Sequence, residues 1–520
     1  MRSVETVLLL VVLATVVATF ARRLQLPAPS LLVVAGVLVG VLPGVPAVEV
    51  TPELVSLVVL PPLLFAAGEE LPWRELRAVW RPVTVLSIGL VLVSAAAVAL
   101  VAVALTPLPF GMAFVLGAIL ASTDPVAVTA LGRRLSLPPR VQALVQAESL
   151  FNDATSLLLF RVALAVAVAV GSLTWTATLG TFALLAGGGL LVGAVVALGA
   201  FLIRRRIEDP VLETVVCLVT PYLAYVLAES VRASGVTAVV VASVILGTQA
   251  GRLTTARIRL QLDAVFQTVV FLLESVIFGL IGLQLPALVR RLSGTESAWP
   301  LQALAIAATL IVVRMLWVFP LAALSRPDSA SRLSWQVPAV VSWAGARGVV
   351  PLAAALSIPL TQGDSTPLPQ RDLVLVLTIA VIVTTLIVQG FTLAPLVNRT
   401  GIALTVRHVN EEHTAARAGL ARAALAYLDE IEESETTPEF AVEQLRRGWR
   451  ARLDRILAHS GDDPEDLAAA GVYRQLRQDL LAVESAELER LHALGSVSDS
   501  TRRRIQRILD LEQAGLSDEL

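Results

Sequence analysis

Apolar residues in this chain collect into long runs that are separated by short polar segments. Each run extends for about 18–28 residues, and about 20 helical residues suffice to cross the hydrocarbon layer of a membrane. We therefore predict an all-α polytopic membrane protein with about 13 transmembrane helices. The predicted spans are 4–21, 28–45, 51–68, 81–107, 111–132, 142–170, 178–203, 211–229, 235–250, 263–286, 300–324, 335–359 and 372–398.

The segments between these spans alternate in arginine content. One alternate set holds sixteen arginines and the other holds four. Arginine is enriched on the cytoplasmic side of membrane proteins, so the first set predicts the cytoplasmic loops and places the N-terminus outside. The sixteen are Arg22, Arg23, Arg74, Arg77, Arg81, Arg133, Arg134, Arg140, Arg204, Arg205, Arg206, Arg252, Arg257, Arg259, Arg326 and Arg332, and the four are Arg232, Arg290, Arg291 and Arg371.

Residues 400–520 differ in composition from residues 1–399, for which we predict the transmembrane domain. They are rich in Arg, Glu, Asp and Ala, which predicts a cytoplasmic helical region. Its plainer interpretation is a solvated appendage rather than a specific sensor. Helical patterns lie at 407–435, 439–459, 464–493 and 498–513, with breaks at 436–438 and 461–464. The four histidines all lie here, so the predicted spans contain none for a proton relay (His408, His413, His459 and His492).

Composition excludes some classes of protein. With 56% apolar and 16% charged residues, the chain is too hydrophobic for an ordinary soluble protein. The net charge of −2 averages two dissimilar regions and gives no indication of a nucleic-acid partner. The single cysteine, Cys217, permits no intramolecular disulfide. We find no phosphate-binding loop, zinc-protease motif or nucleophile elbow, so we expect neither an enzyme nor a cofactor.

An ionisable side chain deep in a membrane span is costly and indicates function. The fifth span carries Thr123 and Asp124 before Pro125. Pro125 lacks a backbone donor and pushes Asp124 away from helical geometry, so we expect this helix to be interrupted. Transporters present such interrupted helices to ions near the middle of the membrane.

The sixth span concentrates polar side chains. Ser149, Asn152 and Asp153 lie at i, i+3 and i+4, so they share one helix face, and Glu148 is one turn from Asn152. Two carboxylates with neutral oxygen donors form a hard-ligand set suited to desolvated Na⁺. A structural salt bridge is the alternative, which we favour for Glu148 but not for Asp153. Glu213, Glu229 and Asp263 lie near span ends, where we expect them to reach water.

The twelfth span contains Gly345, Arg347, Gly348 and Pro351, which again predicts an interrupted helix. It follows the first interrupted span by seven. With an odd offset, corresponding helices run in opposite directions, as in inverted repeats. We therefore predict two inverted six-helix repeats with crossed broken helices, joined by the seventh span.

These segments together resemble the NhaP-type and eukaryotic sodium/proton exchangers, a branch of the monovalent cation/proton antiporters. The resemblance covers about residues 1–400 in order and spacing. It rests on Leu60-Pro61-Pro62-Leu63-Leu64-Phe65, Thr123-Asp124-Pro125, Glu148-Ser149-Leu150-Phe151-Asn152-Asp153 and Gly345-Ala346-Arg347-Gly348.

The resemblance implies an elevator-like homodimer, with spans 4–6 and 11–13 as the mobile core and spans 1–3 and 8–10 as the dimer scaffold. It implies that Asp153 binds either the cation or the proton, that Thr123 and Ser149 help to coordinate the ion, and that Glu148 and Arg347 form a structural ion pair. Asp124 and Asn152 would organise the crossing of the broken helices, beside the ion.

Two further features bear on transport in this family. Asn152 before the key aspartate resembles the electroneutral branch, and the absence of lysine agrees with it. Relatives often carry an acid after the Leu-Leu-Phe segment, where this chain has Ala66, with Glu69 and Glu70 one turn later. Glu274 is the better candidate for lining the cytoplasmic ion funnel.

The expected mechanism is competition between Na⁺ (or Li⁺) and H⁺ for Asp153, which then moves through the bilayer only when it is occupied. Asp153 would thus be the residue that holds the monovalent metal ion. The expected partners are Na⁺, H⁺, the lipid bilayer of a bacterial inner membrane and a second copy of the chain, with a role in pH homeostasis. The alternatives are exchange of K⁺ or mixed cations, a cation channel, and a membrane sensor without transport.

Overall fold

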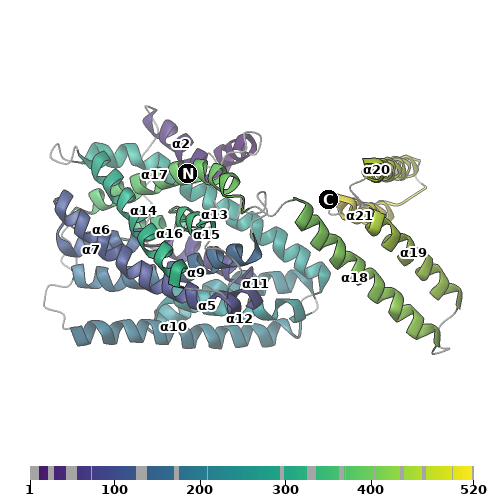
Figure 1. Ribbon diagram of the computed structural model, residues 1–520, viewed down its shortest axis with the longest axis horizontal. Coiled ribbons are helices and arrows are strands. Elements are labelled where there is room, and N and C mark those ends of the chain that lie inside the picture. Colours follow the sequence, from purple (N-terminus) through teal and green to yellow (C-terminus); the bar gives the residue numbers. More distant parts are fainter. Residues whose placement is uncertain are drawn as a thin grey trace. The chain divides into compact units, whose positions relative to one another are not determined.

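The structure is a computed structural model that describes residues 11–21, 28–42, 55–71, 73–124, 138–168, 175–207, 209–253, 255–292, 298–324, 335–361, 368, 370–402, 406–433, 439–458, 464–494 and 496–517. The described residues are overwhelmingly helical and form no β-sheet. The chain divides into two compact units, Met1–Ala403 and Leu404–Leu520 (Figure 1). The division lies close to the change in composition at residue 400.

Described helices cover part or all of each predicted range, and the range 335–359 holds two short helices. Seven described segments are long and apolar enough to cross a membrane, and shorter apolar helices account for other ranges. After a helix at 11–21, the elements are α2 (Ala28–Val41), the π-helix η1 (Val55–Val59), α4 (Leu60–Glu69), α5 (Trp73–Thr84), the π-helix η2 (Val85–Leu90), α6 (Val91–Leu105), α7 (Phe110–Leu120), α9 (Pro139–Val168), α10 (Trp175–Arg204), α11 (Pro210–Ser230), α12 (Gly235–Leu253), α13 (Ala256–Arg291), α14 (Trp299–Leu324), α15 (Gln336–Trp343), α16 (Val349–Leu356) and α17 (Arg371–Thr400).

Large apolar side chains cover much of the outer surface of the first unit, Met1–Ala403. Leu191, Leu301 and Leu316 are each at least 70% exposed. In water such a surface would be unfavourable, but a lipid chain solvates it as well as a protein interior does. The exposed leucines therefore agree with the span lengths in indicating a membrane environment.

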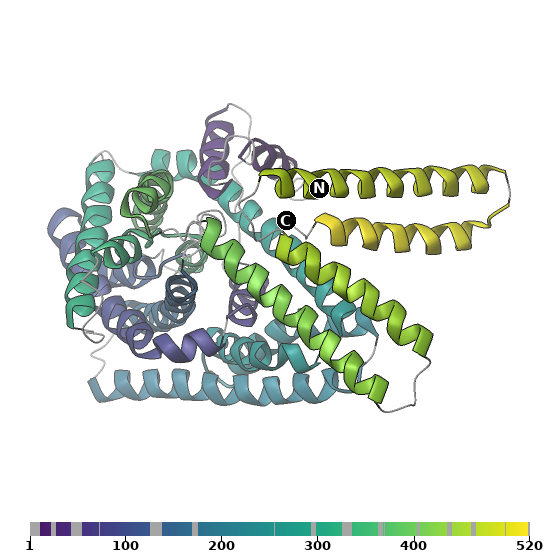
Figure 2. The ribbon, with the colours of Figure 1, turned by 45° about the vertical axis from the view of Figure 1, so that its right-hand side comes forward.

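The helices of the first unit pack in two groups. The first group comprises α5, η2, α6, α7, α9 and α14–α17, which contact one another extensively. The second group comprises α2, η1, α4 and α10–α13, with α2 along α13 and α10 along α12 and α11 (Figures 1 and 2). Contacts of α9, α16 and α17 with the second group join the two.

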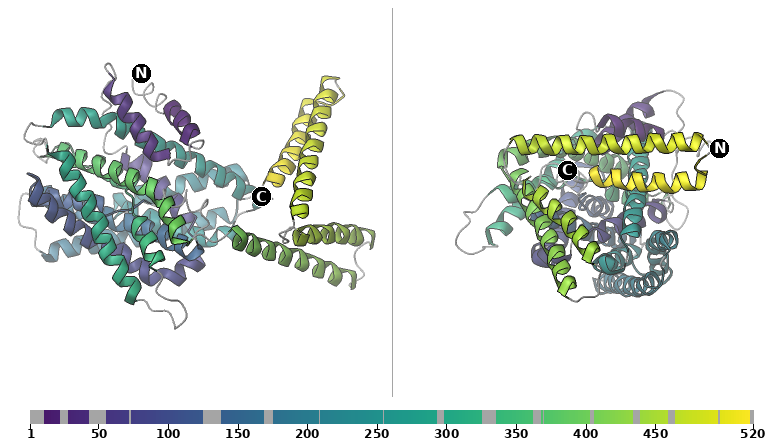
Figure 3. Two further views of the ribbon diagram at one scale, coloured as in Figure 1. Left: turned by 45° about the horizontal axis from the view of Figure 1, so that its top comes forward. Right: turned by 90° about the vertical axis from the view of Figure 1, so that its right-hand side faces the viewer.

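The second unit consists of four helices that pair as two hairpins. They are α18 (Val406–Glu433), α19 (Glu439–Ala458), α20 (Pro464–Ala493) and α21 (Asp499–Ser517), close to the predicted ranges. Within each pair, α18 with α19 and α20 with α21, the two helices lie side by side (Figures 2 and 3). Leu481, Leu488 and Leu509 form the apolar contact between α20 and α21.

Candidate functional site

The C-terminal end of α7 meets the break between α15 and α16 inside the first helix group. Helix α7 ends at Leu120 and the chain continues without helical structure through Asp124. Helix α15 ends at Trp343 and α16 begins at Val349. The amide of Asp124 donates to the carbonyl of Ala346 at 2.7 Å, which joins the two breaks directly. The predicted interruption of the twelfth span is thus confirmed. At the fifth span the helix ends at Leu120, and Pro125 and the rest of the predicted span lie outside the described residues.

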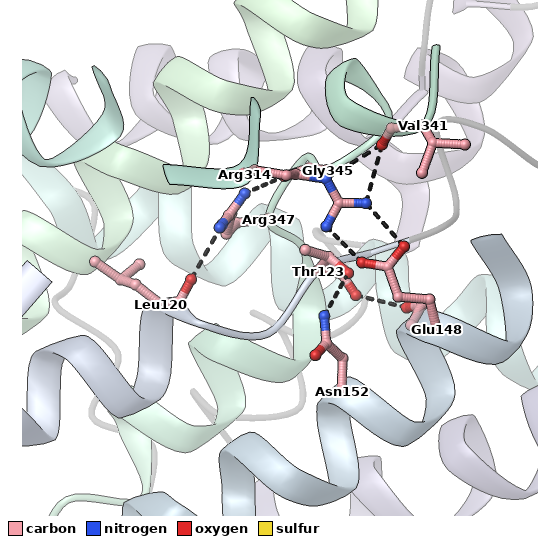
Figure 4. A network of polar contacts seen from close by, with 9 residues as sticks. Leu120, Thr123, Glu148, Asn152, Arg314, Val341, Gly345 and Arg347 are labelled. Carbon is pink, nitrogen blue, oxygen red and sulfur yellow. Dashed lines mark hydrogen bonds and ion pairs between the residues drawn. The ribbon is translucent and has the colours of Figure 1, made fainter. Parts of the chain in front are cut away.

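Charged side chains compensate the helix ends at this crossing. A carboxylate oxygen of Asp124 accepts from the amide of Val349, the first residue of α16, at 3.2 Å. The guanidinium of Arg347 donates to the carbonyl of Leu120, the last residue of α7, at 3.0 Å and to that of Gly345 (Figure 4). Helix N-termini present unpaired N–H groups and C-termini present unpaired carbonyls, so each charge has the sign that its helix end favours.

Gly345 and Gly348, on either side of Arg347, are each approached closely by a charged side chain. A Cβ at Gly348 would overlap the carboxylate of Asp124, and one at Gly345 would lie 2.7 Å from Cδ of Arg314. Any side chain at either position would displace a charged group from the crossing. The glycines that predicted a broken helix therefore also make room for the charges that stabilise it.

Polar side chains of α9 face the broken end of α7. The hydroxyl of Ser149 donates to the carbonyl of Thr123 at 2.5 Å, and the amide nitrogen of Asn152 donates to the Thr123 hydroxyl at 3.1 Å (Figure 4). The hydroxyl of Ser122 donates to the carboxylate of Asp153. All of these side chains are buried, with 7% of Asp153 exposed and none of Asn152. The structure thus brings together Thr123, Ser149, Asn152 and Asp153 as the sequence predicted.

This cluster has acceptor capacity for a cation. Among the described residues, none donates a hydrogen bond to the buried amide oxygen of Asn152. A buried oxygen without a donor is unfavourable unless another electropositive group reaches it. Beside the Asp153 carboxylate, this oxygen offers a neutral ligand of the kind that desolvated monovalent cations bind.

Ser122 is a residue that the sequence reasoning missed. It precedes Thr123 at the break and hydrogen-bonds the central carboxylate. A serine next to the Thr-Asp-Pro segment was the available signal, but an isolated serine in an apolar helix commonly bonds its own backbone.

The partner of Glu148 differs from the expected one. Arg314 of α14 binds both carboxylate oxygens of Glu148, at 2.5 and 2.9 Å, and also the carbonyl of Val341 (Figure 4). Arg347 instead spends its described hydrogen bonds on backbone carbonyls. The Glu148–Arg347 pair that the family resemblance implied is therefore replaced by Glu148–Arg314. Arg347 instead binds the last carbonyl of α7 and a carbonyl within the break between α15 and α16.

Acids of the second helix group lie near the site or in buried ion pairs. Glu274, the funnel candidate on α13, is partly exposed and lies within electrostatic reach of Asp124. Glu213, which we expected to reach water, is instead fully buried and pairs with the buried Arg204 at 3.1 Å. The same arginine lies 3.5 Å from Glu69. The expectation for Glu213 was wrong because its helix end is covered by α10.

Known proteins are similar to this chain over most of its length. Residues 9–399 match the family described as sodium/hydrogen exchanger, transmembrane. The chain is 33% identical to an uncharacterized Na⁺/H⁺ exchanger of Mycobacterium tuberculosis, covering 98% of this chain and 96% of that one. It is 29% identical to the Na⁺/H⁺ antiporter ApNhaP of Aphanothece halophytica, covering 95% and 93%.

A further relative is named for several cations. The sodium, potassium, lithium and rubidium/H⁺ antiporter of Bacillus subtilis is 30% identical, covering 70% of this chain and 56% of that protein. Among solved structures, the sodium proton antiporter MjNhaP1 from Methanocaldococcus jannaschii superposes with a TM-score of 0.64 and 21% identity, covering 77% of this chain and 99% of that one. The family match, the relatives that align along nearly the whole chain and the shared fold lead to one conclusion: this chain is a multi-pass membrane protein that belongs to the transmembrane sodium/hydrogen exchanger family.

Proposed function

We propose that this protein exchanges Na⁺ or Li⁺ for H⁺ across a membrane, by competition of the cation and the proton for Asp153. The single observation that carries the proposal is the position of this carboxylate at the crossing of two broken helices. There it is buried, hydrogen-bonded by Ser122 and adjacent in sequence to Asn152, whose amide oxygen has no donor among the described residues.

The competition follows from the energetics of a buried carboxylate. A bare negative charge is unfavourable away from water, whereas either a proton or a monovalent cation neutralises it. Each of the two occupied forms is therefore able to move through the membrane, and the empty form is not. Such a site exchanges the two ions obligatorily, with the ion gradient as its energy source and without a cofactor.

Neutral oxygens would complete the coordination of the cation. Thr123, Ser149 and Asn152 surround the site, and Asp124 lies beside them at the N-terminus of α16. Only one carboxylate in this set, that of Asp153, is free of a helix-capping bond to a backbone amide. One carboxylate exchanging one proton for one cation supports electroneutral exchange.

The two helix groups supply a physical basis for alternating access. We propose that the first group, which holds Asp153, moves as an elevator against the second. The second group would form the interface of a homodimer, with Glu274 lining the cytoplasmic funnel. In this arrangement the N-terminus is outside a bacterial inner membrane and residues 400–520 are cytoplasmic, as the arginine distribution favours.

A second candidate keeps the mechanism and changes the ion. The Bacillus subtilis relative is named for sodium, potassium, lithium and rubidium. Neutral oxygens around one carboxylate are compatible with each of these ions, because selectivity depends on small differences in the geometry of the site. Exchange of K⁺ or of mixed cations is therefore the alternative that the test must separate.

The test is pH-dye dequenching in proteoliposomes that are challenged in turn with Na⁺, Li⁺ and K⁺. We expect dequenching by Na⁺ and by Li⁺. Asp153→Asn should abolish it, because the neutral amide has no negative charge to hold either the cation or the proton. Asp263→Asn is the matched control, because Asp263 is an exposed acid on α13. A K⁺ response identifies the alternative substrate, and exchange that survives in Asp153→Asn contradicts the mechanism. Exchange that is unchanged by an imposed membrane potential is expected if it is electroneutral.

A further inference from the structure

One ion pair links the two helix groups beyond the site. Arg161, on α9 in the first group, lies 2.6 Å from Glu229 on α11 in the second group. The same guanidinium donates to the hydroxyl of Tyr225, also on α11, at 3.2 Å. Both contacts cross the boundary that alternating access would shear, and neither belongs to the cluster around Asp153.

The location of the pair relative to the ion site is set by helix register. Asp153, Leu157 and Arg161 lie at i, i+4 and i+8 on α9, which places Arg161 about 12 Å along the axis from Asp153 at 1.5 Å per residue. It lies toward the end of α9 that the arginine distribution places outside. Glu229 is near the end of α11, and that end is assigned independently to the same side.

The acceptor half of the contact is held firmly in place. The carboxylate oxygen of Glu229 that binds Arg161 also accepts from the amide of Gly235, at 3.0 Å. A Cβ at Gly235 would lie 2.7 Å from the ring of Tyr225 and 2.8 Å from that same Glu229 oxygen. The turn between α11 and α12 therefore positions both acceptors, through a residue that has no room for a side chain.

The donor half is adaptable. The arginine side chain has several rotatable bonds, and it is partly exposed, as is the glutamate, at 27% and 36%. A pair of this exposure is weak, unlike one sealed in a protein interior. It can therefore form in one arrangement of the helix groups and separate in the other without the large penalty of stranding a buried charge.

We propose that Arg161, Glu229 and Tyr225 form an outer latch, which holds the two helix groups together on the outward side of Asp153 and favours the conformation described above. This inference rests on the proposed alternating access. A ligand or contact shifts a conformational equilibrium only by its preference for one state, and the latch supplies such a preference because its two halves belong to different groups. Arg161 and Glu229 act on the equilibrium and do not touch the ion.

The test measures access from outside to a cysteine placed between the latch and the site. Leu157 is buried on α9 between Asp153 and Arg161, so Leu157→Cys in a Cys217→Ala background provides the probe. Labelling uses a membrane-impermeant maleimide on the full-length protein in right-side-out vesicles. We expect Arg161→Gln and Glu229→Gln each to raise the labelling rate about fivefold, the factor expected from a weak ion pair. The double variant should rise no further, because the two changes remove one interaction.

Two controls separate the latch from general loosening. Arg290→Gln removes an exposed arginine at the C-terminal end of α13, also predicted to be outside, and should leave the labelling rate unchanged. Gly235→Ala alters no charge but displaces both acceptors, and should raise labelling as Arg161→Gln does. Unchanged labelling in the latch variants, an equal rise in Arg290→Gln or additive effects in the double variant would overturn the latch.

The same vesicles distinguish this inference from the proposed function. Asp153→Asn tests exchange itself and leaves Arg161 and Glu229 untouched. If exchange persists in Asp153→Asn, the proposed site fails regardless of the labelling. If exchange is lost in that variant while the latch variants label at the parental rate, the site stands and the latch alone is refuted.

Discussion

Two arginine–glutamate pairs in the first unit have the same chemistry and opposite surroundings. Arg314 and Glu148 are 2% and 1% exposed and form two parallel hydrogen bonds, and both belong to the first helix group. Arg161 and Glu229 are 27% and 36% exposed, share one short contact and belong to different groups. If the two helix groups move as proposed, the first pair would stay closed inside one group and the second would open between the two groups.

Burial explains why the two pairs suit these tasks. A charge sealed away from water needs its partner at all times, so a pair such as Arg314–Glu148 cannot open during transport without a large penalty. A half-exposed pair exchanges its contacts for water at little cost. The pair at the crossing should therefore resist every conformational step, whereas the pair at the boundary should break in one of them.

The largest expected effect is from breaking the buried pair. Arg314→Met leaves the Glu148 carboxylate buried without a cation, which should lower the free energy of unfolding by about 3–5 kcal/mol. Thermal unfolding in detergent measures this change. Combining it with Glu148→Leu should recover most of the loss, since an apolar pair strands no charge. Equal instability of the single and double variants would mean that the pair matters for its shape and not for its charge.

A smaller effect is expected from crowding the same arginine. Gly345→Ala would place a methyl group 2.7 Å from Cδ of Arg314, so that the side chain or the break must shift. Overpacking of this kind should lower the free energy of unfolding by about 1–3 kcal/mol. The matched change at the boundary, Gly235→Ala, should alter stability less, since partly exposed groups have room to move. A larger melting-temperature loss in Gly235→Ala would reverse the proposed contrast.

Removing the boundary pair should barely change stability. Arg161→Gln is expected to lower the free energy of unfolding by at most about 1 kcal/mol. High salt should reduce even that difference, because ions screen partly exposed charges more than buried ones. Melting of the parent and the variant at low and high salt measures both effects. A loss comparable to that of Arg314→Met would show that the boundary pair is a fixed part of the fold.

The smallest effect concerns a charged network on the surface of the second unit. A hydrogen bond from Arg503, with Arg502 nearby, lowers the pKa of Asp499 at the start of α21. The unfolded carboxyl, with its pKa of about 4, then binds protons more readily than the folded one. The stabilising contribution of this carboxylate is present above the pKa of the unfolded carboxyl. It is lost as the pH falls through the lower pKa of the folded carboxyl. Hydrogen exchange of α21 amides, corrected for intrinsic rates, should show slightly less protection at low pH, and Asp499→Asn should remove this dependence.

Local patterns were sufficient to find the main parts of the candidate site. Ser149, Asn152 and Asp153 share a helix face because of their spacing alone, and the structure brings them to Thr123. The glycines around Arg347 marked a broken helix, which the structure contains between Trp343 and Val349. Such features depend on helix geometry and on backbone chemistry within a few residues, so they can be read from neighbouring positions.

Pairings between distant residues could not be predicted in this way. Glu148 and Arg314 are separated by 166 positions, and the choice between Arg314 and Arg347 depends on where the tertiary fold places α14 relative to Glu148. Ser122 was overlooked because its bond to Asp153 exists only when the end of α7 meets α9. Glu213 lies near a helix end in the sequence, but its burial depends on the neighbouring helix.

The sequence by itself determined that the chain crosses a membrane through many apolar helices, that the helix around Arg347 is interrupted, and that a polar face surrounds Asp153. These properties follow from apolar run length, from backbone groups lost or freed at proline and glycine, and from helical periodicity. Only the tertiary structure decided which arginine neutralises Glu148, which helix ends Arg347 and Asp124 compensate, and which charges span the two helix groups. Charge pairing in a low-dielectric interior depends on distances of a few ångströms, and packing alone sets those distances between residues that are far apart in the chain.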